Sequence, residues 1–138
     1  MLTSQPSILK GKVTRPAMIE LGVADTAQLA KTKTFYEALL GETKYPYRLL
    51  TDMALLCVAT ADGSTHTTIY WEVPGKSAEL QQVYDDLIKN HGCAGVHKPH
   101  KPPRDLLFKD DVELATLADA AGNVLGLVIN SPYPFTNQ

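Results

Sequence analysis

The chain has 138 residues, a hydrophobic fraction of 44% and a formal net charge of -2. A chain of this size can bury a full core as one domain without metals or disulfides. Acidic and basic residues are mixed along it, which argues against binding to nucleic acid or to an anionic membrane. No apolar run approaches the roughly 20 residues of a membrane span and the N-terminus has no signal-peptide core, so we expect a cytoplasmic protein.

The first element follows a polar arm. Residues 1–16 are basic and without periodicity, and we expect a loose arm or a tail that clasps a dimer. A strand then alternates between two faces, formed by Ile19, Leu21 and Val23 and by Met18, Glu20 and Gly22. A helix follows that Asp25 or Thr26 can cap and that Gly41 ends, with an apolar stripe of Leu29, Thr32, Phe35, Tyr36, Leu39 and Leu40.

The same strand-then-helix order occurs a second time. Residues 42–60 read as extended structure and residues 61–64 as a turn. A second strand then alternates between Ile69, Trp71 and Val73, which we place on the helix side as core, and Thr68, Tyr70 and Glu72. Ser77 is the expected cap of the next helix, and Gly92 is its stop. The first module is short, so one of its later strands is expected to be reduced or missing.

The last third of the chain reads as a loop followed by a hairpin. Pro99, Pro102 and Pro103 interrupt residues 96–111, which favours an exposed loop over a regular element. Residues 112–119 and 124–130 then read as antiparallel strands joined by a short turn. Together the elements predict an α+β fold of two modules, in each of which the sheet curls into a cup and the helix covers its convex side.

Three motifs, in this order, carry a family resemblance: Leu21-Gly22-Val23-Ala24-Asp25, Phe35-Tyr36-Glu37-Ala38-Leu39-Leu40-Gly41 and Leu117-Ala118-Asp119-Ala120-Ala121-Gly122-Asn123-Val124-Leu125-Gly126-Leu127. Over residues 17–130 the chain resembles the vicinal oxygen chelate superfamily, which contains glyoxalase I, bleomycin-resistance proteins and extradiol dioxygenases. The resemblance implies paired βαβββ modules in a curved, cup-like mixed sheet, commonly in a homodimer. We expect one domain with modules at about 17–64 and 65–130, and a tail at 131–138.

The resemblance also implies where a metal would bind in relatives that use one. Those positions hold Met18, Thr68 and Gly126 here. A thioether, a hydroxyl and a glycine do not form the nitrogen and oxygen set that a divalent ion needs. We therefore expect no metal and no other cofactor at this place, while an atypical divalent site that includes Glu72 or a loop histidine stays open.

The inward faces of the two strands supply the candidate site. Glu20, Tyr70 and Glu72 are predicted to converge, and a carboxylate buried without a cation can act as a general base or hydrogen-bond donor. The alternative is that Glu20 or Glu72 pairs with a lysine or arginine at a solvated rim. His66 shares the strand parity of Thr68 and Tyr70, and it faces either inward or the surface.

Two functions remain open at this point. The first is metal-independent binding or sequestration of a small organic molecule, with Met18, Val124 and Val128 as an apolar wall beside the polar groups. His97 and Arg104 belong either to a basic lid for an anionic ligand or to an exposed loop. The second function is a glyoxalase-like lyase or isomerase that uses Glu20 as general base.

Overall fold

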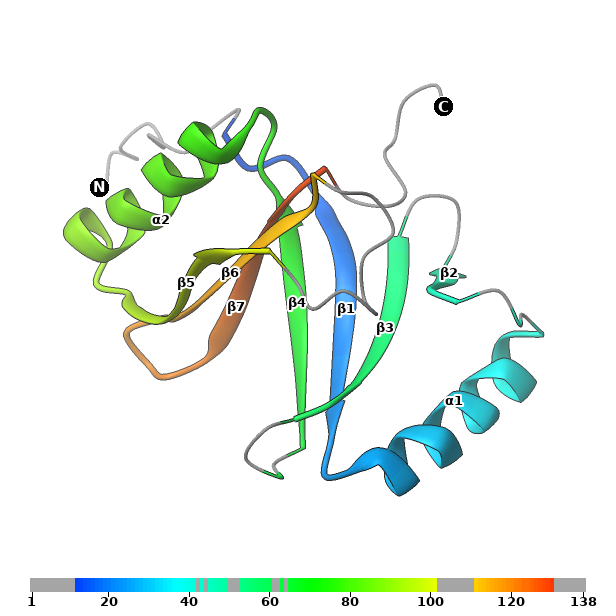
Figure 1. The fold of residues 1–138 in the computed structure, drawn as a ribbon. Coiled ribbons are helices and arrows are strands. Elements are labelled where there is room, and N and C mark those ends of the chain that lie inside the picture. Colours follow the sequence, from blue (N-terminus) through cyan, green and yellow to red (C-terminus); the bar gives the residue numbers. More distant parts are fainter. Residues whose placement is uncertain are drawn as a thin grey trace, which may run out of the picture. The chain divides into compact units, whose positions relative to one another are not determined.

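The computed structural model describes residues 12–41, 43, 45–49, 53–60, 63, 65–101 and 111–130. Arg104, most of the expected arm and the tail at 131–138 lie outside the described residues. The elements, labelled in Figure 1, are β1 (Pro16–Val23), α1 (Thr26–Leu40), β2 (Tyr47–Leu49), β3 (Met53–Ala59), β4 (His66–Glu72), α2 (Ser77–Asn90), β5 (Ala94–His100), β6 (Glu113–Ala118) and β7 (Val124–Ile129).

The chain folds as two compact units, and the boundary between them lies inside β4. The N-terminal unit contains Pro16–Tyr70, and the C-terminal unit contains residues 12–15 with Trp71–Asn130. In the N-terminal unit the strand order is β2-β3-β1-β4, with β1 parallel and β2 antiparallel to β3. In the C-terminal unit β6 lies between β7 and β5 and is antiparallel to both.

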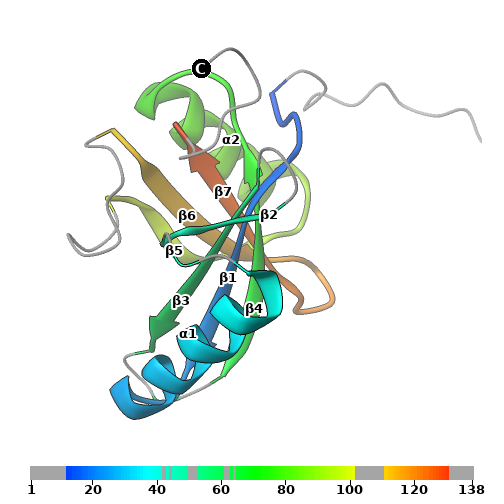
Figure 2. The same ribbon diagram turned by 90° about the vertical axis from the view of Figure 1, so that its right-hand side faces the viewer.

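In the N-terminal unit, α1 begins and ends where the sequence predicts. The Asp25 carboxylate accepts a hydrogen bond from the Gln28 amide at 2.8 Å, and Gly41 ends the helix with a φ of 67°. Figure 2 shows α1 against the strands of this unit. The predicted stripe is wrong in part, because Phe35 and Leu39 are 58% and 63% exposed. The core consists of Tyr47, Leu55 and Cys57, against which Ile19, Leu21, Leu29, Tyr36 and Leu40 pack half-buried.

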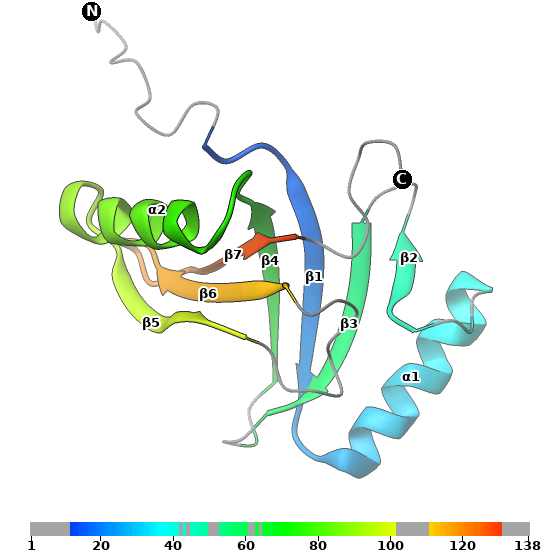
Figure 3. The same ribbon diagram turned by 45° about the horizontal axis from the view of Figure 1, so that its top comes forward.

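In the C-terminal unit, α2 packs on the hairpin of β6 and β7, as Figure 3 shows. The predicted cap was wrong by one residue: Lys76 is the N-cap, and its amide donates to the Glu79 carboxylate at 2.7 Å. Trp71 is 37% exposed, so its predicted core role is also wrong. The buried cluster consists of Val73, Leu80, Val83, Tyr84, Leu87, Ala115, Leu117, Leu127 and Ile129.

The segment predicted as a loop after residue 96 is a strand as far as His100, so that prediction was wrong there. The physical reason is that β5 pairs with β6 at the end of the strand order. A proline is tolerated in an edge strand because one side of the strand needs no backbone donor. Pro99 therefore fits within β5, while residues 102–110 lie outside the described residues.

The α+β class with a mixed sheet is confirmed. The second module is β4-α2-β5-β6-β7, and in the described part of the first module α1 is followed by β2 and β3. The first of these has three described residues, and the residues that separate it from β3 lie outside the described ranges. Neither described helix combines the length and apolar character that crossing a membrane would require.

Candidate functional site

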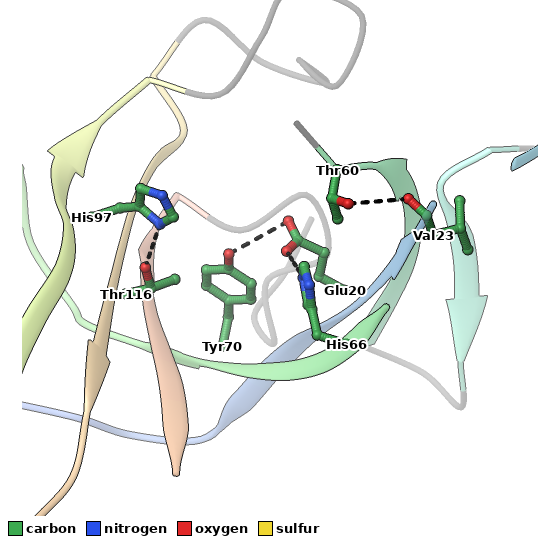
Figure 4. Close-up of polar contacts among 7 residues, drawn as sticks. All are labelled: Glu20, Val23, Thr60, His66, Tyr70, His97 and Thr116. Carbon is green, nitrogen blue, oxygen red and sulfur yellow. Dashed lines mark hydrogen bonds and ion pairs between the residues drawn. The ribbon is translucent and has the colours of Figure 1, made fainter. Parts of the chain in front are cut away.

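A carboxylate, an imidazole and a phenol meet in the N-terminal unit. Oε1 of Glu20 on β1 lies 3.0 Å from Nε2 of His66 on β4. The Tyr70 hydroxyl, also on β4, donates to Oε2 of Glu20 over a longer distance of 3.4 Å. Figure 4 shows both contacts. Glu20 therefore holds one group with each of its two oxygens.

Strand alternation explains why these groups share a face. Ile19 and Leu21 pack toward α1, so Glu20 between them points to the opposite side of β1. His66 and Tyr70 are four residues apart on β4, which also places them on one face. Their side chains are unequally accessible: that of His66 is 38% exposed and that of Glu20 is 16% exposed, whereas Tyr70 is buried.

The contact with Glu20 indicates which ring nitrogen of His66 carries the proton and which one can act as a base. An ionised carboxylate only accepts hydrogen bonds, so the Nε2 atom that faces it carries the proton. Nδ1 of the same ring makes no hydrogen bond to any described residue, and in the neutral ring its lone pair can accept a proton. The pair is thus arranged as a base, His66, with an orienting carboxylate, Glu20.

The phenol of Tyr70 serves as a permanent donor to this carboxylate. Burial of the ring, together with the nearby charge of Glu20 and the hydrogen bond to it, raises the pKa of Tyr70 above its ordinary value. Tyr70 therefore stays protonated and continues to donate to Glu20 over the whole neutral range.

Thr68 and Met18 lie on the same strand faces as the group formed by Glu20, His66 and Tyr70. Thr68 lies between His66 and Tyr70 on β4, on the same face, and only 3% of it is exposed. Its hydroxyl has no hydrogen-bond partner among the described residues, although a buried hydroxyl without a partner costs about 1–3 kcal/mol. Met18 is buried on the same face of β1 as Glu20. Thr68 therefore has a buried hydroxyl, without a partner among the described residues, on the same face of β4 as His66 and Tyr70.

Glu72 does not join this group, although the sequence suggested that it would. In the C-terminal unit its Oε1 lies 3.0 Å from Nε of Arg15, and the Thr14 hydroxyl also contacts it. This is the ion-pair alternative that the sequence left open, but Arg15 is 6% exposed, so the pair is not at a solvated rim. A carboxylate held in this way is not available as a base or as a metal ligand.

The remaining candidates are in the C-terminal unit. Nδ1 of His97 lies 2.8 Å from the Thr116 hydroxyl, and Thr116 is paired in register with Gly126. His97 also lines a shallow groove of about 530 Å³ together with Tyr84, Val96, Lys98 and His100. Arg104 lies outside the described residues.

The predicted apolar wall is only partly present. Val128 is fully buried, as Met18 is in its own unit, but Val124 is 47% exposed. The reason is its position, because Val124 is the first residue of β7 directly after the turn. Val124 therefore does not line an enclosed apolar surface.

The residues at the superfamily's metal positions do not fit a divalent ion. Met18, Thr68 and Gly126 supply a thioether, a hydroxyl and no side chain, which is a poor set for such an ion. Within the described ranges, no three His, Cys, Asp or Glu side chains are grouped so that they could hold a metal.

Sequence reasoning placed Glu20 and Tyr70 together but did not decide where His66 points. The available signal was the strand parity that His66 shares with Thr68 and Tyr70. Parity gives the face of a strand but not the register against its neighbour, and the register is what brings His66 to Glu20.

Comparisons with known proteins support the fold. No protein-family model matches the chain, and no curated protein matches it. Among solved structures, it is similar to a variant methylmalonyl-CoA epimerase of Streptomyces coelicolor in complex with 2-nitronate-propionyl-CoA, with 15% identity, coverage of 85% of this chain and 97% of that one, and a TM-score of 0.52.

A second similar structure is a methylmalonyl-CoA epimerase in complex with methylmalonyl-CoA and NH4+. It is 14% identical, the match covers 88% of this chain and 99% of the other, and the TM-score is 0.53. At such low identity the shared feature is the fold alone: this chain has the fold of the methylmalonyl-CoA epimerases.

Proposed function

We propose that the protein is a metal-independent acid–base enzyme that transfers a proton at the carbon next to a carbonyl group, as an isomerase or a lyase of the vicinal oxygen chelate superfamily does. The observation that carries this proposal is the 3.0 Å contact between Glu20 and His66, which leaves Nδ1 of an accessible imidazole unpaired among the described residues.

The chemistry follows from this arrangement. Nδ1 of His66 accepts the proton as the C–H bond breaks, and the electron pair of that bond moves toward the carbonyl carbon while the oxygen becomes an enolate. Glu20 stabilises the imidazolium that forms, in the role that a carboxylate has beside a catalytic histidine. Return of the proton from His66 to the same carbon restores the carbonyl group and the neutral imidazole, so this step, which an isomerisation or an elimination also begins with, balances as proton exchange with no net change in electrons.

The developing negative charge on the substrate oxygen needs a donor. Thr68 offers a buried hydroxyl on the same face of β4 as His66, without a partner among the described residues. A donor that is already in position costs little reorganisation when charge develops in the transition state. We assign this role to Thr68, which makes it a ligand-binding residue.

The substrate class is a small organic acid or its thioester. The two epimerases of the same fold are described with methylmalonyl-CoA and with 2-nitronate-propionyl-CoA. In a thioester the carbonyl acidifies the neighbouring C–H bond, which suits removal of its proton by an imidazole. Short acyl-CoA thioesters and 2-oxo acids are therefore the first compounds to test.

The experiment measures proton exchange in D2O by NMR. Short acyl-CoA thioesters and 2-oxo acids are incubated with protein that has been treated with a chelator. We expect deuterium to enter the carbon next to the carbonyl of at least one compound. Glu20→Gln and His66→Asn should each reduce the rate about 10²-fold or more. His91→Asn is the matched control, because His91 is a half-exposed histidine at the end of α2.

Three results would contradict the proposal. They are exchange no faster than in buffer for every compound, full activity in His66→Asn, and loss of activity on chelation. Full activity in His66→Asn with loss in Glu20→Gln would instead identify Glu20 itself as the base.

Ligand binding without turnover is the second candidate, and the groove at His97 favours it. Its lining combines two imidazoles and Lys98 with Tyr84 and Val96, which suits an organic anion. Lys98 forms no ion pair within the described residues. AMP, as an organic anion, should raise the melting temperature of the wild type by mass action and be recovered unchanged, and it should not raise that of Lys98→Ala.

The assembly and location of the protein remain predictions. The resemblance to the superfamily carries the expectation of a homodimer, and the sequence carries that of a cytoplasmic protein. Light scattering of the purified protein tests the homodimer, because a single species at the mass of one chain would contradict it.

A further inference from the structure

His66 can reach Glu20 only because the residue beneath its ring is Gly22. A Cβ atom added at Gly22 would lie 2.3 Å from Cε1, 2.6 Å from Nδ1 and 2.7 Å from Nε2 of the His66 ring. Real Cβ atoms do not approach other atoms so closely, so with any residue other than glycine at this position the imidazole, which is the end of a 38% exposed side chain, would have to move. The ring therefore lies directly against the backbone of β1.

The position of Gly22 explains why this contact matters. Gly22 and Glu20 are two residues apart on β1 and so share one face. The His66 ring lies over Gly22 while its Nε2 contacts Glu20 at 3.0 Å. The nitrogen that faces Glu20 and the nitrogen that we assign as the base are both among the atoms that a Cβ would displace.

We infer that Gly22 is a positioning residue: its missing side chain provides the space in which the His66 imidazole is held against Glu20. The expected effect of Gly22 on catalysis rests on the proposed function, whereas the positioning of the His66 ring does not. This positioning role also separates two uses of glycine in this chain, because Gly41 is needed for its positive φ, whereas a Cβ atom at Gly22 would displace the His66 ring.

The first test measures the ring rather than the activity. NMR with ¹⁵N-labelled histidine gives the tautomer of His66 through its two ring nitrogens. In the wild type we expect the proton on Nε2, and in Gly22→Ala we expect this preference to be lost. Gly95→Ala is the matched control, since Gly95 is also a strand glycine whose Cβ would meet an aromatic side chain, with Tyr84 Oη at 2.2 Å. It should leave the His66 signals unchanged.

A double-mutant cycle separates this collision from a general cost of alanine in β1. Gly22→Ala should lower the urea midpoint of unfolding in the wild type, but not in the His66→Ala background, where the space is free. An equal decrease in both backgrounds would overturn the inference. Unchanged His66 signals in Gly22→Ala would overturn it as well.

The activity measurement then distinguishes the inference from the proposed function. Since a displacement of about 1 Å in a catalytic group can cost about 10²-fold, we expect Gly22→Ala to lower kcat by that factor with little change in KM. If the tautomer preference is lost but exchange continues at the wild-type rate, the positioning role stands and the proposed role of His66 in catalysis fails.

Discussion

Nε of Arg15 lies 3.0 Å from Oε1 of Glu72 in the C-terminal unit, and the two side chains are only 6% and 17% exposed. The backbones of the same segments also pair, because the Glu72 amide donates to the Arg15 carbonyl at 2.8 Å. The end of the predicted arm is therefore fixed to β4. The ion pair gives Glu72 a structural role, which leaves Glu20 as the candidate catalytic carboxylate.

We predict that Arg15→Met destabilises the protein by about 2 kcal/mol, because it leaves a mostly buried carboxylate without its charged partner. The double variant Arg15→Met with Glu72→Leu should recover much of this loss, since replacing both charges by apolar groups is often neutral. Urea unfolding measures both effects. If the double variant is as unstable as Arg15→Met, the ion pair does not have the role assigned here.

The alternation of β1 and β4 could be predicted from the sequence because it is local. In β1 the apolar residues at every second position identify the face toward α1. In β4 alternation gives the two faces but not which of them is buried, because Ile69 and Trp71 are 44% and 37% exposed. Contacts between distant segments could not be predicted in this way. Arg15 and Glu72, or Glu20 and His66, are brought together by strand pairing, for which alternation gives the face but not the register.

The errors in the elements have equally specific causes. From the sequence alone, Pro99 argues against a strand at 96–100, but a proline is tolerated in a strand at the edge of a sheet, and only the strand order shows that β5 lies there. The stripe on α1 predicted burial for Phe35 and Leu39, yet both are exposed. Helical periodicity defines which side chains share a face of the helix, but not how much of that face is covered by neighbouring elements.

Thr68→Val tests the proposed oxyanion donor. The substitution removes a buried hydroxyl that has no partner among the described residues, so stability without substrate should be unchanged or increased. Loss of the donor should lower kcat about 10²-fold. Thr67→Val, at an exposed neighbouring position on the other face of β4, is the control and should retain activity. Wild-type turnover in Thr68→Val would refute the assignment.

Tyr70 makes the protein sensitive to alkaline pH. Its pKa in the folded state is raised above the ordinary value of 10.0, so the phenol contributes stability that is complete below this value and is lost as the pH rises, because the unfolded chain ionises first. In Tyr70→Phe, the unfolding midpoint should fall less steeply between about pH 9 and 11. Tyr36→Phe is the control. A slope equal to that of the wild type in Tyr70→Phe would contradict the prediction.

Asp119 should have the opposite dependence, at acid pH, in the turn between β6 and β7. Its carboxylate accepts from the amides of Ala121 and Asn123 and from the Asn123 side chain. The hydrogen bonds from Asn123 are the main reason why the pKa of Asp119 lies below its ordinary value of 3.8. Because the folded-state pKa is lowered, the stability that ionised Asp119 contributes is present above pH 3.8 and is lost as the pH falls through the folded-state pKa.

Asp119→Asn should therefore be less stable than the wild type at neutral pH. The difference in the free energy of unfolding should shrink as the pH falls below 3.8. Urea midpoints of the wild type and of Asp119→Asn, measured between about pH 2 and 6, would show this decrease in the difference. Asp111→Asn, at an exposed position, is the control for the change in net charge. A difference that stays constant across the acid range would mean that the Asp119 charge does not stabilise the turn, and that the hydrogen bonds alone would suffice to hold the hairpin.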